Sequence, residues 1–211
     1  MATKARSDEA KQDRLDAILA AARGLFAERG FDAVTMADIA RAAGLAKGTL
    51  YLYCRTKEEV FLALMGDEFA GWFAALGAVL TDSETAGLED FAHGFARTAA
   101  ERPELLRLVS ILHVVLERNA TEAILLPFKL GLRDALASLG AAVEGRFALA
   151  AGEGAAFLLQ AYALVIGFSH LDADSPTVRA LLARDELAPL RIDFETGLTA
   201  ALDRLCAGYR R

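Results

Sequence analysis

Residues 44–59, with the sequence GLAKGTLYLYCRTKEE, combine cationic, hydroxyl and aromatic side chains at a helical spacing. Lys47 and Tyr51 are four residues apart, and so are Thr49 and Tyr53. Residues four apart lie on one face of a helix. Lysine and hydroxyl groups contact DNA phosphates, while tyrosine and threonine reach base edges or thymine methyl groups. The spacing therefore favours a face that enters a DNA groove.

Gly48 lies within the same face, where the absence of a side chain lets the backbone approach a partner closely. The alternative is that the two tyrosines only cover a hydrophobic core. That alternative explains either tyrosine alone, but it does not explain the lysine, the threonine and the glycine beside them.

The net charge of −6 for the whole chain argues against nucleic-acid binding. The two parts of the chain differ in charge, however, when they are counted separately. Residues 1–57 hold ten Lys and Arg against seven Asp and Glu, whereas residues 58–211 hold thirteen against twenty-two. A basic end on an acidic chain indicates a nucleic-acid-binding region. A solvated surface produces a modest asymmetry of this kind equally well, so the charge supports the motif without establishing it.

The elements that must position this face begin with a long helix. Apolar residues recur at helical spacing from Asp8 to Arg29, and Gly30 supplies a left-handed stop. Thr35 and Asp38 form a capping box that predicts the start of a second, short helix. Gly44 ends that helix.

A third helix is predicted from about residue 46 to residue 53, with Leu50 and Cys54 on its core side. Thr56 and Glu59 form another capping box, so a fourth helix follows at once. Two short helices joined by a tight glycine turn and braced by a long first helix make a helix-turn-helix.

The stretch ILAAARGLFAERGFDAVTMADIARAAGLAKGTLYLYCRTKEEVFLAL carries a family signature. On this stretch, residues 15–65 closely resemble the DNA-binding domain of the TetR (tetracycline-repressor) family of bacterial regulators. The resemblance implies a homodimer that binds a double-stranded DNA operator, with a variable helical ligand-binding domain. It also implies DNA contacts at the matching positions, which are Thr35, Lys47, Gly48, Thr49, Tyr51, Tyr53 and Lys57. Lys57 suits this role because it would begin the fourth helix near a phosphate.

Two residues depart from the family pattern. Ala46 stands where a serine usually caps the recognition helix, and the loss of such a cap typically costs about 1 kcal/mol. Cys54 stands where a phenylalanine is usual, so we expect weaker packing and a buried, inert thiol. A redox-sensing role for Cys54 is the less favoured alternative.

The expected fold is all-α. An N-terminal three-helix DNA-binding domain over residues 1–57 is followed by a larger helical bundle over residues 58–211, which binds a ligand and dimerises. The later helices are predicted at 57–80, 88–100, 103–118, 122–144, 154–171 and 192–209, with a kink or restart at Pro127.

Residues 157–168 are apolar all round, which favours burial on both faces. With the last helix, this segment is the candidate dimer interface, comprising Phe157, Leu164, Phe168, Phe194, Gly197, Leu198, Ala201 and Leu205. Candidates for an apolar effector pocket are Phe69, Trp72, Phe73, Phe91, Phe95, His113, Phe128, Phe157 and Tyr162, with Glu117 and Gln160 as further polar anchors. A plain aromatic core would have the same pattern.

The sequence contains no motif that favours another class of function. The three histidines are isolated, so neither a metal site nor a cofactor is expected, and no constellation predicts an enzyme. The longest apolar stretch, residues 155–168, is shorter than a membrane span. The N-terminus shows no cationic leader followed by an apolar stretch, so we expect a cytoplasmic protein. The favoured function is a ligand-released transcriptional repressor. A constitutive DNA-binding protein and a small-molecule or lipid carrier are the alternatives.

Overall fold

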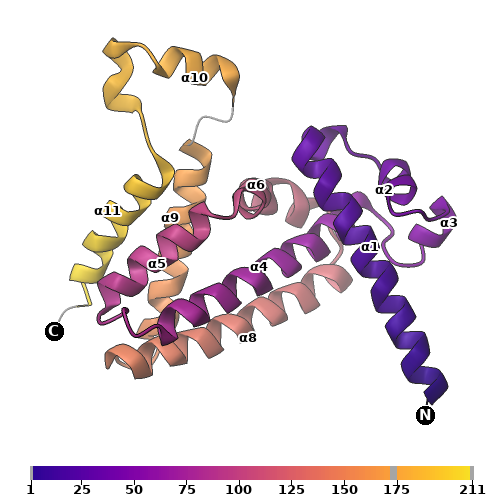
Figure 1. The fold of residues 1–211 in the computed structure, drawn as a ribbon, viewed down its shortest axis with the longest axis horizontal. Helices are drawn as coiled ribbons and strands as arrows, with labels where there is room; N and C mark the ends of the chain where they lie inside the picture. Colours follow the sequence, from indigo (N-terminus) through magenta and orange to yellow (C-terminus); the bar gives the residue numbers. More distant parts are fainter. Residues whose placement is uncertain (1, 172–174, 210–211) are drawn as a thin grey trace. The chain divides into compact units, whose positions relative to one another are not determined.

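A computed structural model describes residues 2–171 and 175–209 of the chain, with side chains from residue 9 onward. Helices and turns form the described residues, and no strand occurs among them, so the all-α prediction is confirmed (Figure 1). The chain divides into two units. Unit 1 comprises Met1–Glu68 and Ile111–Lys129, and unit 2 comprises Phe69–Ser110 and Leu130–Arg211.

Unit 1 begins with helix α1, which runs from Ala2–Ala33 and so starts before the predicted Asp8. Gly30 has φ 74° and ψ 174°, and α1 is kinked there. The chain then resumes helical turns for three residues instead of ending at the glycine. Helices α2 (Met36–Ala42), α3 (Lys47–Leu50) and α4 (Lys57–Thr81) follow.

The core of unit 1 forms around Phe61 of α4. The Phe61 ring meets the rings of Phe26 and Phe31 edge to face, with centroid distances of 5.3 and 4.9 Å. Ile18 and Ile39 are fully buried in the same unit. At the surface, the Arg23 guanidinium joins α1 to α4 by ion pairs with Asp67 and Glu68, at 2.6 and 2.9 Å.

The helix predicted over residues 103–118 is present as a continuous helical segment, but it is not α-helical throughout. Helix α6 (Pro103–Ile111) passes into a π-helical turn η1 (Leu112–Leu116) and then α7 (Glu117–Asn119). By contrast, α8 (Glu122–Phe147) continues as one helix through Pro127, so the chain does not restart there. The alternative of a kink at Pro127 stays a prediction.

Unit 2 contains α5 (Leu88–Ala100), α9 (Glu153–Leu171) and α11 (Phe194–Ala207), with α11 packed against both α5 and α9 (Figure 1). Trp72 is 2% exposed, and its indole Nε1 donates to Thr98 Oγ1 at 3.1 Å. The α8–α9 connection is held by Glu144, whose Oε1 accepts from the Gly152 and Gly154 amides at 2.8 and 3.1 Å.

Two elements of unit 2 were not predicted, namely α10 (Pro176–Leu182) and the 3₁₀ helix η2 (Asp185–Leu190). They pack on each other, and the Arg191 guanidinium donates to the Leu182 and Ala183 carbonyls at 2.5 and 2.9 Å. These carbonyls belong to the last turn of α10, so Arg191 satisfies groups that the helix leaves unpaired.

Helices α4 and α9 are long and apolar enough to cross a membrane by length and composition, a test that buried core helices also pass. The shortness of the apolar stretch at residues 155–168 argues against a membrane span. Helix α9 extends beyond this stretch at both ends, so its length does not support that argument. The absence of a membrane partner stays a prediction.

Candidate nucleic-acid interface

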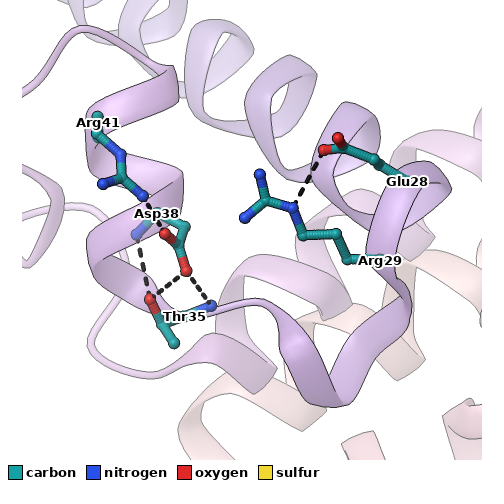
Figure 2. A network of polar contacts seen from close by, with 5 residues as sticks. All are labelled: Glu28, Arg29, Thr35, Asp38 and Arg41. Atoms are coloured by element: carbon teal, nitrogen blue, oxygen red, sulfur yellow. Dashed lines mark hydrogen bonds and ion pairs between the residues drawn. The ribbon is translucent and has the colours of Figure 1, made fainter.

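Helix α2 starts at a complete capping box, as predicted. The Thr35 side chain accepts from the Asp38 amide at 3.2 Å, and Asp38 Oδ2 accepts from the Thr35 amide at 3.2 Å (Figure 2). Asp38 Oδ2 also accepts from the Thr35 hydroxyl at 2.6 Å. Hydrogen bonds from Thr35 are the main reason that the pKa of Asp38 lies below its ordinary value. Val34 and Ile39 are buried on either side of this start.

The turn between α2 and α3 is fixed by Gly44, whose φ is 68°. The Leu45 amide donates to the Ala40 carbonyl at 2.9 Å, and the Gly44 amide donates to the Arg41 carbonyl at 3.2 Å. This pair of bonds is a Schellman motif, which needs a left-handed residue where glycine stands. The turn sets the direction in which α3 leaves α2.

Helix α3 is shorter than predicted. It ends at Leu50, and the Leu52 and Tyr53 amides donate to the Thr49 and Leu50 carbonyls, three residues back. Both tyrosines therefore lie beyond the last residue of α3, and Tyr51 is its C-cap. Ala46 occupies the N-cap without a side-chain hydrogen bond, as the departure from the family pattern implies.

The predicted DNA-contacting residues of this segment differ in exposure. Lys47 and Gly48 are exposed, Tyr51 is 42% exposed, and Thr49 and Tyr53 are half-buried. The Lys47 ammonium lies 5.9 Å from the centre of the Tyr51 ring, so these two side chains share one surface. Leu50 is fully buried on the opposite side and anchors the helix to unit 1.

Sequence reasoning missed Leu52, which is 82% exposed between the two tyrosines. Its position two residues after the buried Leu50 was the available signal. Lys57 is less free than predicted, because its ammonium donates to the Phe31 carbonyl at 2.8 Å and lies 4.0 Å from the centre of the Phe31 ring. The ammonium thus binds a carbonyl group in the last turn of α1.

The second predicted capping box is only half formed. The Glu59 amide donates to the Thr56 hydroxyl at 3.2 Å, but the Glu59 carboxylate accepts from the Arg55 amide at 2.6 Å instead of from Thr56. Cys54 beside it is buried, and burial together with Glu59 raises the pKa of its thiol to about 11. The predicted burial of Cys54 is confirmed.

The residues predicted to line a ligand pocket fall into both units. His113 and Phe128 belong to unit 1, where His113 Nδ1 lies 3.2 Å from Glu117 Oε1. In unit 2 the Trp72 ring packs against Phe95 at 4.9 Å, and the Phe69 ring packs against Tyr162 at 5.7 Å, both between centroids. The unit 2 candidates are Phe69, Trp72, Phe73, Phe91, Phe95, Phe157 and Tyr162.

A cleft of about 420 Å³ in unit 2 is lined by different residues. They are Val79, Asp82, Glu84, Thr85, Asp90, His93, Gly94, Arg97, Glu195 and Thr199. Their charges are mostly acidic, so this cleft is not the aromatic pocket that the sequence suggested. No group of His, Cys, Asp and Glu within residues 2–171 and 175–209 could hold a metal ion.

The residues predicted to form the dimer interface also differ in their solvent exposure. Phe157, Phe194 and Leu198 lie in the core of unit 2, whereas Leu164, Phe168, Gly197, Ala201 and Leu205 are half-buried. The Phe168 ring lies against Gly197, where an added methyl group would come within 2.7 Å of it. One side of α9 is buried in unit 2, whereas Leu159, Ala163 and Gly167 are exposed in the single chain. Burial of this second side by a partner subunit stays a prediction.

An N-terminal helix-turn-helix followed by a helical bundle is the architecture of a DNA-binding transcriptional regulator. Residues 18–64 match the family described as bacterial regulatory proteins, tetR family, and residues 66–211 match the tetracyclin repressor-like C-terminal domain. The chain therefore belongs to the TetR family of transcriptional regulators.

Curated relatives match this chain over part of its length. The transcriptional repressor KstR2 of Mycolicibacterium smegmatis is 36% identical over 76 residues, which are 36% of this chain and 37% of the relative. The regulator QacR of Staphylococcus aureus is 37% identical over 57 residues, which are 27% of this chain and 30% of the relative. The chain thus spans about a third of the length of these relatives.

Solved structures share the fold over nearly the whole chain. The fatty acid degradation regulator FadR from Bacillus halodurans has a TM-score of 0.60 at 19% identity, covering 93% of this chain and 99% of that one. The complex of SmeT with triclosan has a TM-score of 0.59 at 21% identity, covering 94% and 92%. SmeT is the repressor of a multidrug efflux pump of Stenotrophomonas maltophilia.

Proposed function

We propose that this regulator binds a palindromic DNA operator as a homodimer and is released from it by a small apolar or amphipathic molecule. Residues 1–57 would form the DNA-binding part and residues 58–211 the ligand-binding and dimerisation part. Repression is the favoured outcome, because relatives such as KstR2 and SmeT are named as repressors. The protein would act in the cytoplasm, where its operator lies.

The observation that carries the proposal is the exposed surface of α3. Lys47 and Gly48 are exposed on α3, and Tyr51 is exposed directly after its last residue. The Gly44 turn fixes the direction of this helix, and Leu50 anchors its inner side. A rigid element with donors and aromatic groups on its free side suits major-groove contacts. Thr49 and Tyr53 flank this surface and are proposed to complete it.

Dimerisation is supported by the free side of α9. Leu159 is 57% exposed, and Ala163 and Gly167 lie one and two turns further along the same side. A row of apolar and small residues along one side of a helix lets a second copy of the chain pack closely against it. The proposed interface therefore uses these residues with the half-buried Leu164, Phe168, Gly197, Ala201 and Leu205, while Phe157, Phe194 and Leu198 support it from the core.

Release by an effector is supported by the aromatic cluster around Trp72. Its rings are apolar and closely packed, so a ligand there must displace them and is expected to be apolar itself. SmeT, which shares this fold, forms a complex with triclosan. His113 and Phe128 lie in unit 1, so the proposal leaves them out of the pocket.

Helix α4 is proposed to couple ligand binding to DNA binding. It begins at Lys57 after the helix-turn-helix and reaches beyond Trp72 as one unbroken helix of 25 residues. A ligand that favours the DNA-free state would weaken operator binding by its differential affinity, and a coupling of about 1–3 kcal/mol corresponds to roughly five- to 150-fold.

The test has two stages. First, the wild-type protein is used to select duplexes from a random-sequence library, and an enriched palindrome supports the operator and the dimer together. Second, hydrophobic compounds are titrated while the emission of Trp72, the single tryptophan, and operator binding are followed. A compound that changes both supports the repressor with an effector. Selection of a palindrome without any responsive compound favours the constitutive regulator, and binding of compounds without any DNA selection favours the carrier.

A further inference from the structure

The Thr35 hydroxyl has no hydrogen left for a DNA phosphate. A hydroxyl carries one hydrogen, and an ionised carboxylate only accepts hydrogen bonds. The contact of 2.6 Å between Thr35 Oγ1 and Asp38 Oδ2 therefore uses that hydrogen, and Oγ1 in turn accepts from the Asp38 amide. The Thr35 amide donates to the same carboxylate oxygen. If the DNA contact expected at Thr35 is to a phosphate, it thus needs another donor.

Arg41 is the donor that the structure places beside this site. Its Nη2 donates to Asp38 Oδ1, the other oxygen of the carboxylate that binds Thr35 (Figure 2). The Arg41 side chain is 76% exposed. A guanidinium group has five N–H donors in a fixed plane, and Asp38 is bonded to Nη2 alone in this network.

A second guanidinium group lies at the end of α1. Arg29 is 43% exposed and donates from Nε to Glu28 Oε2 at 3.1 Å. Its head group points toward the Thr35–Asp38 pair in Figure 2, and its charge contributes to the lowered pKa of Asp38. Two exposed cations therefore flank a threonine whose own donor is occupied.

We infer that Arg41, held in place by Asp38, is a DNA-backbone contact of α2 and takes the role expected of the Thr35 hydroxyl. The inference rests on the proposed operator binding. Guanidinium groups bind phosphate oxygens through two parallel N–H bonds, which matches the free edges of Arg41. An exposed ion pair three residues apart contributes little to folding, so binding is the better account of the arrangement.

The test uses a duplex selected by the wild-type protein from a random library, together with a scrambled duplex of the same length. Arg41→Ala is expected to weaken binding to both duplexes about five- to tenfold at 0.1 M salt. Because the proposed dimer loses one contact in each subunit, the slope of log affinity against log salt should fall by about 1.8. Arg41→Lys should keep most of the slope because the charge remains.

Arg133→Ala is the matched control. Arg133 is a 66%-exposed arginine that is ion-paired with Asp134 on α8 of unit 2, so its loss removes the same charge from a helix other than α2. The control is expected to keep the wild-type slope. If the alanine variant of Arg41 does not fold, as judged by circular dichroism, Arg41→Gln provides the same measurement.

Three results are decisive. Failure of the wild-type protein to bind any duplex would overturn the proposed function itself. Wild-type binding with an unchanged slope and affinity in the Arg41 variants would overturn only this inference. Equal losses in the Arg41 and Arg133 variants would also overturn it, because a general effect of net charge would then explain the data.

Discussion

Gly154 of α9 lies directly against the backbone of Gly140 of α8. A methyl group at residue 154 would collide with the Gly140 carbonyl, and one at residue 140 would lie 2.8 Å from the amide nitrogen of Ala155. The two helices therefore approach as closely as they do only because neither glycine has a side chain. This contact fixes α9 on α8 within unit 2.

Gly154→Ala is expected to destabilise the protein by about 1–3 kcal/mol, because a tightly packed backbone cannot give way to the added methyl group. Thermal unfolding followed by circular dichroism measures the change. Gly131→Ala is the control, since nothing lies within 4 Å of its added methyl group and Gly131 lies in α8. The control should gain roughly 0.5–1 kcal/mol. A similar gain in both variants would refute the close contact.

Thr35→Ala is expected to destabilise the protein by about 1 kcal/mol, because α2 loses the side-chain cap on the Asp38 amide. For a chain of this size the midpoint of thermal unfolding should fall by roughly 2–4 °C. Thr35→Ser keeps the hydroxyl and should unfold close to the wild-type temperature. Equal midpoints for the alanine and serine variants would show that the cap contributes nothing.

Local signals of this kind are the part of the fold that the sequence predicts well. The Thr35–Asp38 box and the Gly44 turn depend on residues that are close in sequence, and both are found as predicted. The bond from Lys57 to the Phe31 carbonyl joins residues far apart in the chain, so the residue pattern around Lys57 did not indicate it.

Other differences have the same origin. The π-helical turn of η1 adds a residue to a helical turn without altering the apolar spacing enough to be noticed. Helices α10 and η2 are exposed along most of their length, so they lack the periodic apolar pattern from which helices were predicted. The bond from the Thr35 hydroxyl to Asp38 is visible only from interatomic distances, which the spacing of residues in the sequence does not provide.

Leu159→Glu is expected to shift the protein from dimer to monomer, because a buried interface would receive an unpaired charge. Sedimentation equilibrium at several concentrations measures the change in the dissociation constant. Leu126→Glu is the matched control, since Leu126 is 53% exposed on the part of α8 that belongs to unit 1. A variant of Leu159 that remains as dimeric as the control would place the interface elsewhere.

Cys54 should be unreactive toward iodoacetamide at pH 8 in the folded protein and reactive once the protein is unfolded. Its pKa of about 11 keeps the thiol protonated, and its burial blocks access. Because the folded pKa is raised above the ordinary thiol value of 9.0, the contribution of Cys54 to stability is present below pH 9 and is lost as the pH rises toward about 11.

Cys54→Ala removes this titration, so its stability should vary less with pH between 9 and 11 than that of the wild-type protein. Urea unfolding at several pH values provides the comparison. Rapid alkylation of the folded wild-type protein at pH 8, traced to Cys54 by peptide mapping, would contradict the raised pKa.

We expect the exposed side of α3, together with Tyr51 directly after it, to read DNA sequence, and the variant Tyr51→Ala distinguishes base contacts from backbone contacts. Tyr51 is 42% exposed beside Lys47, and the change leaves the buried Leu50 in place. The measurement is the affinity of wild-type and variant proteins for the selected duplex and for a scrambled duplex at one salt concentration. If Tyr51 contacts bases, the variant should lose about 1–3 kcal/mol, or roughly five- to 150-fold, on the selected duplex and little on the scrambled one. An unchanged ratio of the two affinities would show that Tyr51 contacts no base.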